Sequence, residues 1–108
     1  AFEQARLSIS YTNLNVNIVA SHGGLDTGPD VASAQCIEDL ACFRSLPNFT
    51  VLCPCDSNEM YQAVSTISQY EGPVYMRTGR SNVENITNPN KKLITSLARK
   101  LLMQILRK

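Results

Sequence analysis

Short apolar runs alternate with segments of helical periodicity along most of this chain. Three runs rich in β-branched and aliphatic residues predict strands, and three longer segments predict amphipathic helices. The predicted strands are Val16–Ala20, Thr50–Cys53 and Val74–Met76, and the predicted helices are about Phe2–Ser10, Ala34–Ser45 and Asp56–Tyr70. Helices between successive strands favour parallel pairing with right-handed crossovers. The pattern therefore predicts an α/β fold with a parallel sheet.

Local signals set the expected helix ends. Ser33 is placed to cap the second helix at Ala34, and Asp56 followed three residues later by Glu59 predicts a capping box for the third. The second helix is expected to bury one apolar face, made of Ile37, Leu40 and Ala41. Glu38 and Asp39 on the same helix are interpreted as packing or capping residues.

The chain changes character after Arg80. Residues 81–90 are rich in Asn and Ser and predict a polar linker, and residues 91–108 predict an amphipathic helix with an apolar leucine and isoleucine stripe. Residues 1–88 carry four arginines and nine acidic residues, whereas residues 89–108 carry six basic residues and no acidic one. Such a basic block is typical either of a solvated helix face or of a nucleic-acid or membrane-surface element. The stripe is expected to pack over the sheet of its own domain; pairing with another chain and lipid contact are the alternatives.

Size and composition narrow the class of protein. The 108 residues and 11.9 kDa allow a single domain, and 44% hydrophobic with 18% charged residues is the balance of a globular protein. No apolar run approaches the length that spans a bilayer. The four cysteines lack zinc-type spacing, and Cys36 and Cys42 would lie on different faces of one helix. They are expected to be reduced, partly buried thiols of a cytosolic protein.

The most informative segment is the glycine-punctuated stretch SHGGLDTGPDVASAQCIEDLACFR, residues 21–44. It places His22 and Asp30 on a loop that follows the first strand, where ligands of open α/β sheets bind. The segment resembles the pyrimidine-binding domain of transketolase in His22, Gly28, Asp30, Ala32, Ser33, Gln35, Ile37, Glu38 and Asp39. The blocks AFEQARLS, RSLPNFTVLCPCDSNE and EGPVYMRTGR extend this resemblance over residues 1–80. It implies a three-layer α/β/α domain with a short, mainly parallel sheet, here truncated and followed by the amphipathic helix.

The resemblance also implies a substrate site. In the family, the residues at the positions of His22, Asp30 and Arg80 bind the sugar phosphate, the first and last at its phosphate and the second at a hydroxyl group. Arg77 has no such counterpart and is interpreted as structural. Ala34 stands where the family has a histidine that approaches the reacting sugar, and a methyl group neither donates nor transfers a proton. No catalytic residue and no metal ligand is assigned in this chain.

Family members use thiamine diphosphate with magnesium. Their cofactor-activating glutamate and the aromatic residues that stack on the thiamine pyrimidine lie upstream of the position where Ala1 aligns. Their magnesium and diphosphate motif belongs to a separate domain. This chain alone is therefore not expected to bind the cofactor.

The resemblance predicts a transketolase fragment of the pentose phosphate pathway, inactive alone, whose parent reaction transfers a two-carbon ketol unit between sugar phosphates. The alternatives are a non-catalytic interaction or regulatory module and a subunit of a split transketolase. Expected partners are a sugar phosphate and either a second copy of the chain or another transketolase subunit. Nucleic acid and membrane are not expected partners, and the expected location is cytoplasmic.

Overall fold

The computed structural model describes residues 1–90. The chain forms two compact units, one made of Ala1–Pro54 with Glu71–Asn82 and the other of Cys55–Tyr70 with the residues from Val83 onward. The helix predicted over residues 91–108, with its basic charge and apolar stripe, lies outside the described residues.

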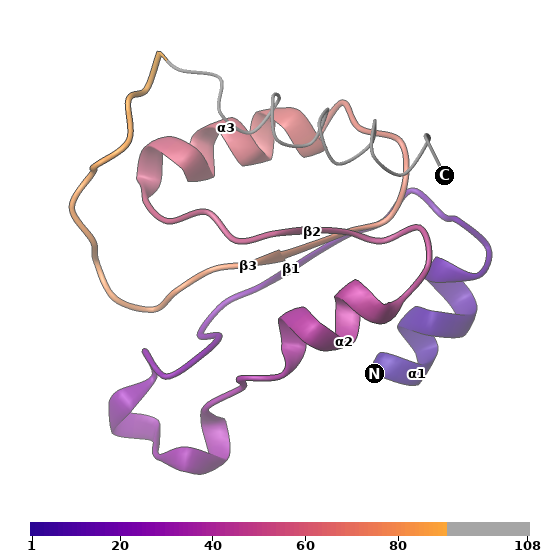
Figure 1. Ribbon diagram of the computed structural model, residues 1–108, viewed down its shortest axis with the longest axis horizontal. Coiled ribbons are helices and arrows are strands. Elements are labelled where there is room, and N and C mark those ends of the chain that lie inside the picture. The colour runs from indigo at the N-terminus through magenta and orange to yellow at the C-terminus, as the bar shows by residue number, and fades with distance from the viewer. Residues whose placement is uncertain (91–108) are drawn as a thin grey trace. The chain divides into compact units, whose positions relative to one another are not determined.

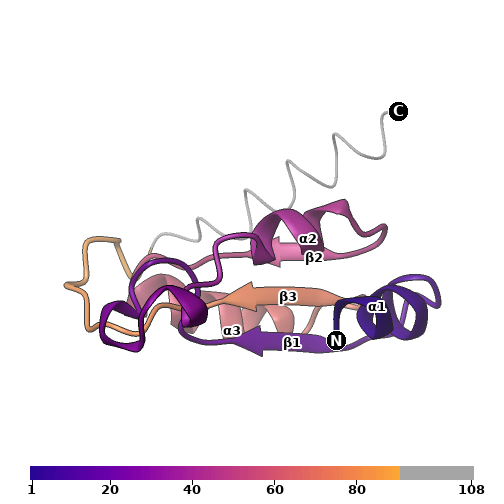
Figure 2. The same cartoon turned by 90° about the horizontal axis from the view of Figure 1, so that it is seen from below.

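The first unit contains a sheet of three parallel strands. They are β1 (Asn17–Ala20), β2 (Thr50–Leu52) and β3 (Val74–Arg77), in the order β1-β3-β2. Figure 2 shows the three arrows side by side and pointing the same way. The fold class predicted from the alternating pattern, a small parallel α/β sheet, is confirmed.

The central strand β3 is the most buried element of the sheet. Val74, Tyr75 and Met76 are each at most 4% exposed, and alternation along the strand turns Tyr75 to the opposite face from the other two. A run buried on both faces is typical of a central parallel strand. This burial explains why the sequence of β3 is continuously apolar up to Arg77.

Aromatic side chains fasten the helices of the first unit to the Tyr75 face. The Phe43 ring of helix α2 (Asp39–Ser45) stacks on the Tyr75 ring, with centroids 3.9 Å apart and an interplanar angle of 6°. Phe43 also meets Phe49 and the Phe2 ring of α1 (Phe2–Gln4). Figure 1 shows α1 and α2 on the same side of the strands, in agreement with these contacts. The predicted first helix continues past α1 as a π-helical turn over Ala5–Ser10.

The second helix begins later than predicted. Two 3-10 turns, Gly28–Asp30 and Ala32–Ala34, precede it, and Gln35 directly after the second is extended, with φ −81° and ψ 95°, so that no helix continues from Ala34. Ser33 therefore caps no helix. The predicted buried face is also wrong, because Ile37 is 67% exposed and Ala41 is exposed, while Asp39 is only 7% exposed.

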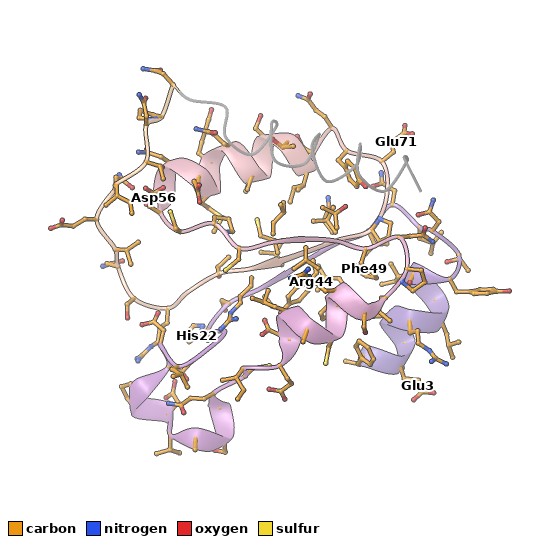
Figure 3. All side chains as sticks on the ribbon, in the orientation of Figure 1. Glu3, His22, Arg44, Phe49, Asp56 and Glu71 are labelled. Atoms are coloured by element: carbon orange, nitrogen blue, oxygen red, sulfur yellow. The ribbon has the colours of Figure 1, made fainter. Side chains whose placement is uncertain are left out.

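The second unit contains helix α3 (Ser57–Ile67), whose predicted capping box is confirmed. The Asp56 carboxylate accepts from the Glu59 N–H at 2.9 Å, and the Glu59 carboxylate accepts from the Cys55 N–H at 2.9 Å. Asp56, labelled in Figure 3, also accepts from the N–H groups of Ile86 and Thr87 and from the Thr87 hydroxyl. Burial alone would raise the pKa of Asp56, but these hydrogen bonds outweigh it and hold that pKa well below its usual range. Part of the predicted linker is thereby attached to the start of α3.

The four cysteines are free, as predicted. Cys42 is half-buried, but Cys36, Cys53 and Cys55 are exposed, so the expectation of partly buried thiols is wrong for three of them. Cys36 also precedes α2, so it does not share a helix with Cys42. Within residues 1–90, no helix has the length and apolarity needed to cross a bilayer, and no group of three His, Cys, Asp or Glu side chains could hold a metal ion.

Candidate functional site

The loops that follow β1 and β3 meet at the carboxyl edge of the sheet, which we define as the ends of the strands and these two loops. The Thr78 N–H donates to the Ala20 carbonyl at 2.8 Å, and the Gly23 N–H donates back to the Thr78 carbonyl at 3.3 Å. The strand register pairs Ala20 with Arg77 just before this point. The parallel pairing therefore continues beyond the strands and brings the two loops together.

Asp26 joins the two loops through its carboxylate. Oδ2 accepts from the backbone N–H groups of Arg80 and Ser81, each at 2.7 Å, and Oδ1 accepts from the Ser81 hydroxyl. We call this set of three hydrogen bonds the Asp26 bridge. Gly79 lies beside it, and a Cβ at that position would be 3.2 Å from Asp26 Oδ2. The glycine thus leaves room for the carboxylate to approach the backbone.

The Asp26 bridge also sets the charge of the carboxylate. Hydrogen bonds from the Ser81 hydroxyl and from the Ser81 and Arg80 N–H groups, with a contribution from the Arg80 guanidinium, lower the pKa of Asp26 to about 2. Asp26 is therefore ionised at neutral pH, and the stability that this shift contributes is present above pH 4 and is lost as the pH falls toward 2.

A buried polar cluster joins the start of α2 to the central strand β3. The Tyr75 hydroxyl donates to Asp39 Oδ2 at 2.7 Å, and Arg77 Nη1 lies 3.5 Å from Asp39 Oδ1 as an ion pair. Burial, together with the hydrogen bond to Asp39, raises the pKa of Tyr75, so the phenol stays protonated and keeps donating. Asp39 and Arg77 are 7% and 17% exposed.

The Arg77 side chain runs along the backbone of the two glycines that follow His22. A Cβ at Gly23 would lie 2.3 Å from Arg77 Nε, and a Cβ at Gly24 would lie 2.0 Å from Arg77 Nη2. Gly24 also has φ +80°, which favours glycine. Together, the Arg77–Asp39 ion pair and the glycines fix the start of the loop. This agrees with the structural interpretation of Arg77 and with a packing role for Asp39.

The three predicted substrate residues all belong to the carboxyl edge, and all three side chains are exposed. His22 follows β1 with φ 64°, and its Nδ1 lies 2.9 Å from the Ser21 hydroxyl; Figure 3 shows it where the chain leaves the sheet. Asp30 ends the first 3-10 turn, and Arg80 is held through its backbone by Asp26. No hydrogen bond or ion pair links any two of these three described residues. Their substrate role remains a prediction.

Two parts of this site were missed by the sequence reasoning, namely the Asp26 bridge and the pairing of Asp39 with Arg77. An aspartate in a glycine-rich loop is a general sign of side-chain bonding to backbone N–H groups. That sign does not reveal the partner, which for Asp26 lies 54 residues away in the sequence. The positive φ of Val31 has no signal in the sequence, because β-branched residues rarely adopt it.

Comparison with known proteins identifies one family. The family model described as transketolase, pyrimidine binding domain, matches residues 1–85, five residues beyond the end of the predicted resemblance. A putative transketolase C-terminal section from Methanocaldococcus jannaschii is 43% identical over 86 residues, which cover 80% of this chain and 27% of that protein. A subunit of the apulose-4-phosphate transketolase from Phocaeicola vulgatus is 30% identical over 86 residues, which cover 80% of this chain and 28% of that protein.

A solved structure agrees with these relatives. The structure described as split gene transketolase, inactive beta4 tetramer, superposes with a TM-score of 0.74 at 43% sequence identity, over 86% of this chain and 29% of that one. The chain therefore spans less than a third of the length of each of these proteins.

Proposed function

The chain belongs to the family of transketolase pyrimidine-binding domains, and we propose that its carboxyl edge forms part of the sugar phosphate site of a transketolase. The observation that carries the proposal is the arrangement of two loops. His22 follows an outer strand and Arg80 follows the central strand beside it, and the Asp26 bridge holds the two loops together. Ligands of open parallel sheets bind at this edge.

Each residue has a role that suits its chemistry. The Arg80 guanidinium binds a phosphate group with two parallel N–H donors. The His22 imidazole donates a third hydrogen bond to the phosphate in either of its protonation states. Asp30 accepts from a sugar hydroxyl. None of the three moves a proton or forms a covalent bond, so they bind and orient the substrate.

The chemical step requires parts of the enzyme beyond these residues. Thiamine diphosphate, when bound in this family, supplies the carbanion that carries the ketol unit. Within residues 1–90, no group of three His, Cys, Asp or Glu side chains could hold a metal ion, so we do not assign the family's magnesium and diphosphate motif to these residues. Ala34 lies in the same loop as Asp30, Val31 and Ala32, and its side chain is only a methyl group. We therefore assign His22, Asp30 and Arg80 to substrate binding.

A chain that only binds the substrate requires other parts of a transketolase to complete the active site. Two of the similar proteins are described as a subunit or a section of a transketolase, and the solved one as an inactive tetramer of a split enzyme. They support a chain that acts as a transketolase subunit, in association with the remaining subunits or with a second copy. The role in the pentose phosphate pathway and the cytoplasmic location belong to the same proposal. A non-catalytic interaction module is the competing function, and its main support is the basic segment outside the described residues.

Replacing Arg80 by Ala is expected to abolish phosphate binding by the chain. The guanidinium supplies most of the attraction, and within residues 1–90 no other arginine follows a strand at this edge. Titration of the ¹⁵N-labelled chain with inorganic phosphate, followed by NMR, measures the effect through the shifts of His22 and its neighbours. The matched control is Arg44→Ala, which removes an exposed arginine in the last turn of α2. Phosphate-induced shifts that survive in Arg80→Ala would contradict the proposed site.

The chain alone is expected not to bind thiamine diphosphate with micromolar affinity. The pyrimidine ring needs stacking aromatic groups and the diphosphate needs a magnesium site, and in the family both lie outside the segment that this chain resembles. Isothermal titration calorimetry with the cofactor and magnesium is the measurement. Heat of binding that saturates at micromolar cofactor would show that residues of this chain replace the family's cofactor elements, and the interpretation as a substrate-binding part would then be wrong.

A further inference from the structure

We propose that Asp26 is a positioning residue for Arg80, and this inference rests on the proposed sugar phosphate site. Arg80 lies three residues beyond the end of β3, in a segment with no helix or strand. Within residues 1–90, the hydrogen bonds that hold Arg80 and Ser81 go to the Asp26 carboxylate. The Asp26 bridge is therefore the contact that fixes the backbone from which the Arg80 guanidinium projects.

The bridge also links this backbone to the loop of the other phosphate ligand. Asp26 lies four residues after His22, and the Gly24 N–H between them donates to the Cys36 carbonyl at 2.7 Å. Arg77 covers the same glycines from the side of β3. The loop that carries His22 is thus held on two sides, and Asp26 extends that support to Arg80. Fixing both ligands before binding reduces the conformational entropy that a flexible site would lose.

If Asp26 positions Arg80, removing Asp26 lowers the affinity for phosphate, whereas electrostatics alone predicts that the affinity rises. The carboxylate is ionised and lies close enough to Arg80 to interact with its guanidinium. A negative charge near an anion site repels a phosphate, so its removal would raise affinity if charge were all that mattered. The Arg80 and Ser81 N–H groups, once freed, would also be available to an anion. A fall in phosphate affinity on removing Asp26 therefore distinguishes positioning from charge.

The experiment titrates the full chain and its variants with inorganic phosphate, followed by NMR of the Arg80 Nε–H group and of the His22 ring. Asp26→Ala is expected to weaken phosphate binding roughly five- to tenfold. Asp26→Asn, which keeps an oxygen acceptor and loses the charge, is expected to lie between Asp26→Ala and the unaltered chain. Glu84→Gln is the matched control, because it removes an exposed carboxylate from a residue outside the bridge. It is expected to leave phosphate binding unchanged or slightly tighter.

A second variant separates geometry from charge. Gly79→Ala keeps the Asp26 charge but places a Cβ 3.2 Å from Oδ2, so it is expected to loosen the bridge and weaken phosphate binding by a smaller factor. Amide hydrogen exchange at Arg80 and Ser81 reports the bridge directly and is expected to speed up in Asp26→Ala and Gly79→Ala. Both readouts changing together supports the inference.

Two results would contradict the inference about Asp26, and only the second would also contradict the proposed function. If the unaltered chain binds phosphate through Arg80 and Asp26→Ala binds it equally or more tightly, Asp26 does not position Arg80 while the proposed function stands. If the unaltered chain shows no phosphate binding that depends on Arg80, the proposed function fails and this inference fails with it.

Discussion

Replacing Asp39 by Ala is expected to lower the free energy of unfolding by about 3 kcal/mol. The change removes the carboxylate that pairs with Arg77 and accepts from Tyr75, and it leaves a guanidinium that is only 17% exposed without its partner. The cost of an unpaired, largely buried charge exceeds the modest gain that the ion pair itself provides. Equilibrium unfolding in urea measures the difference.

Glu38→Ala is the matched control for this prediction. Glu38 is the neighbouring carboxylate, but it is exposed, and among residues 1–90 it accepts only from the Ile37 N–H, at 3.0 Å. Its loss is expected to change the free energy of unfolding by about 0.5 kcal/mol or less. The double variant Asp39→Leu with Arg77→Met removes both charges and is expected to recover much of the lost stability. Equal losses for Asp39→Ala and Glu38→Ala would mean that the buried cluster contributes little.

Replacing Gly23 by Ala is expected to destabilise the chain by an amount close to that of Asp39→Ala, because it displaces the same arginine. The new Cβ would lie within 3 Å of three Arg77 side-chain atoms, Nε, Cγ and Cδ, so the side chain must leave its position. Moving it separates the guanidinium from Asp39. Urea unfolding of the single and double variants measures both effects.

The control for this substitution is Gly28→Ala, where a Cβ would meet nothing within 4 Å and the φ value is ordinary. That variant is expected to be neutral or slightly stabilising. In an Arg77→Ala background, Gly23→Ala should lose most of its effect, whereas Gly24→Ala should stay unfavourable by about 1 to 2 kcal/mol because of its φ of +80°. Additive effects of Gly23→Ala and Arg77→Ala would contradict the proposed contact.

The strands were predictable because each is a short run rich in β-branched and aliphatic residues, although of the three only the central strand β3 is buried on both faces. Each observed strand falls within one residue of its predicted bounds, and the capping box at Asp56 was predicted from residues three apart. These are local signals. The position of His22 and Arg80 at one edge follows equally from their place after parallel strands.

The interior of the loop between β1 and α2 could not be predicted in the same way. Helix propensity favours a start near Ala34, but Gln35 is extended, and the helix begins only at Asp39, whose side chain contacts Tyr75 and Arg77. These are contacts between residues far apart in the sequence. The same is true of Asp26, whose partners follow a strand that the chain reaches only much later.

The strand order has a consequence for how the sheet comes into being. The strand in the middle, β3, is the last of the three to appear in the sequence, and β1 and β2 pair with it and not with each other. During synthesis, β1 cannot pair with β3 until Val74, the partner of Asn17, has been made. Bringing two such distant segments together costs loop-closure entropy before any contact between them compensates for that cost. A chain that ended before Val74 would therefore lose the whole sheet and not merely one strand.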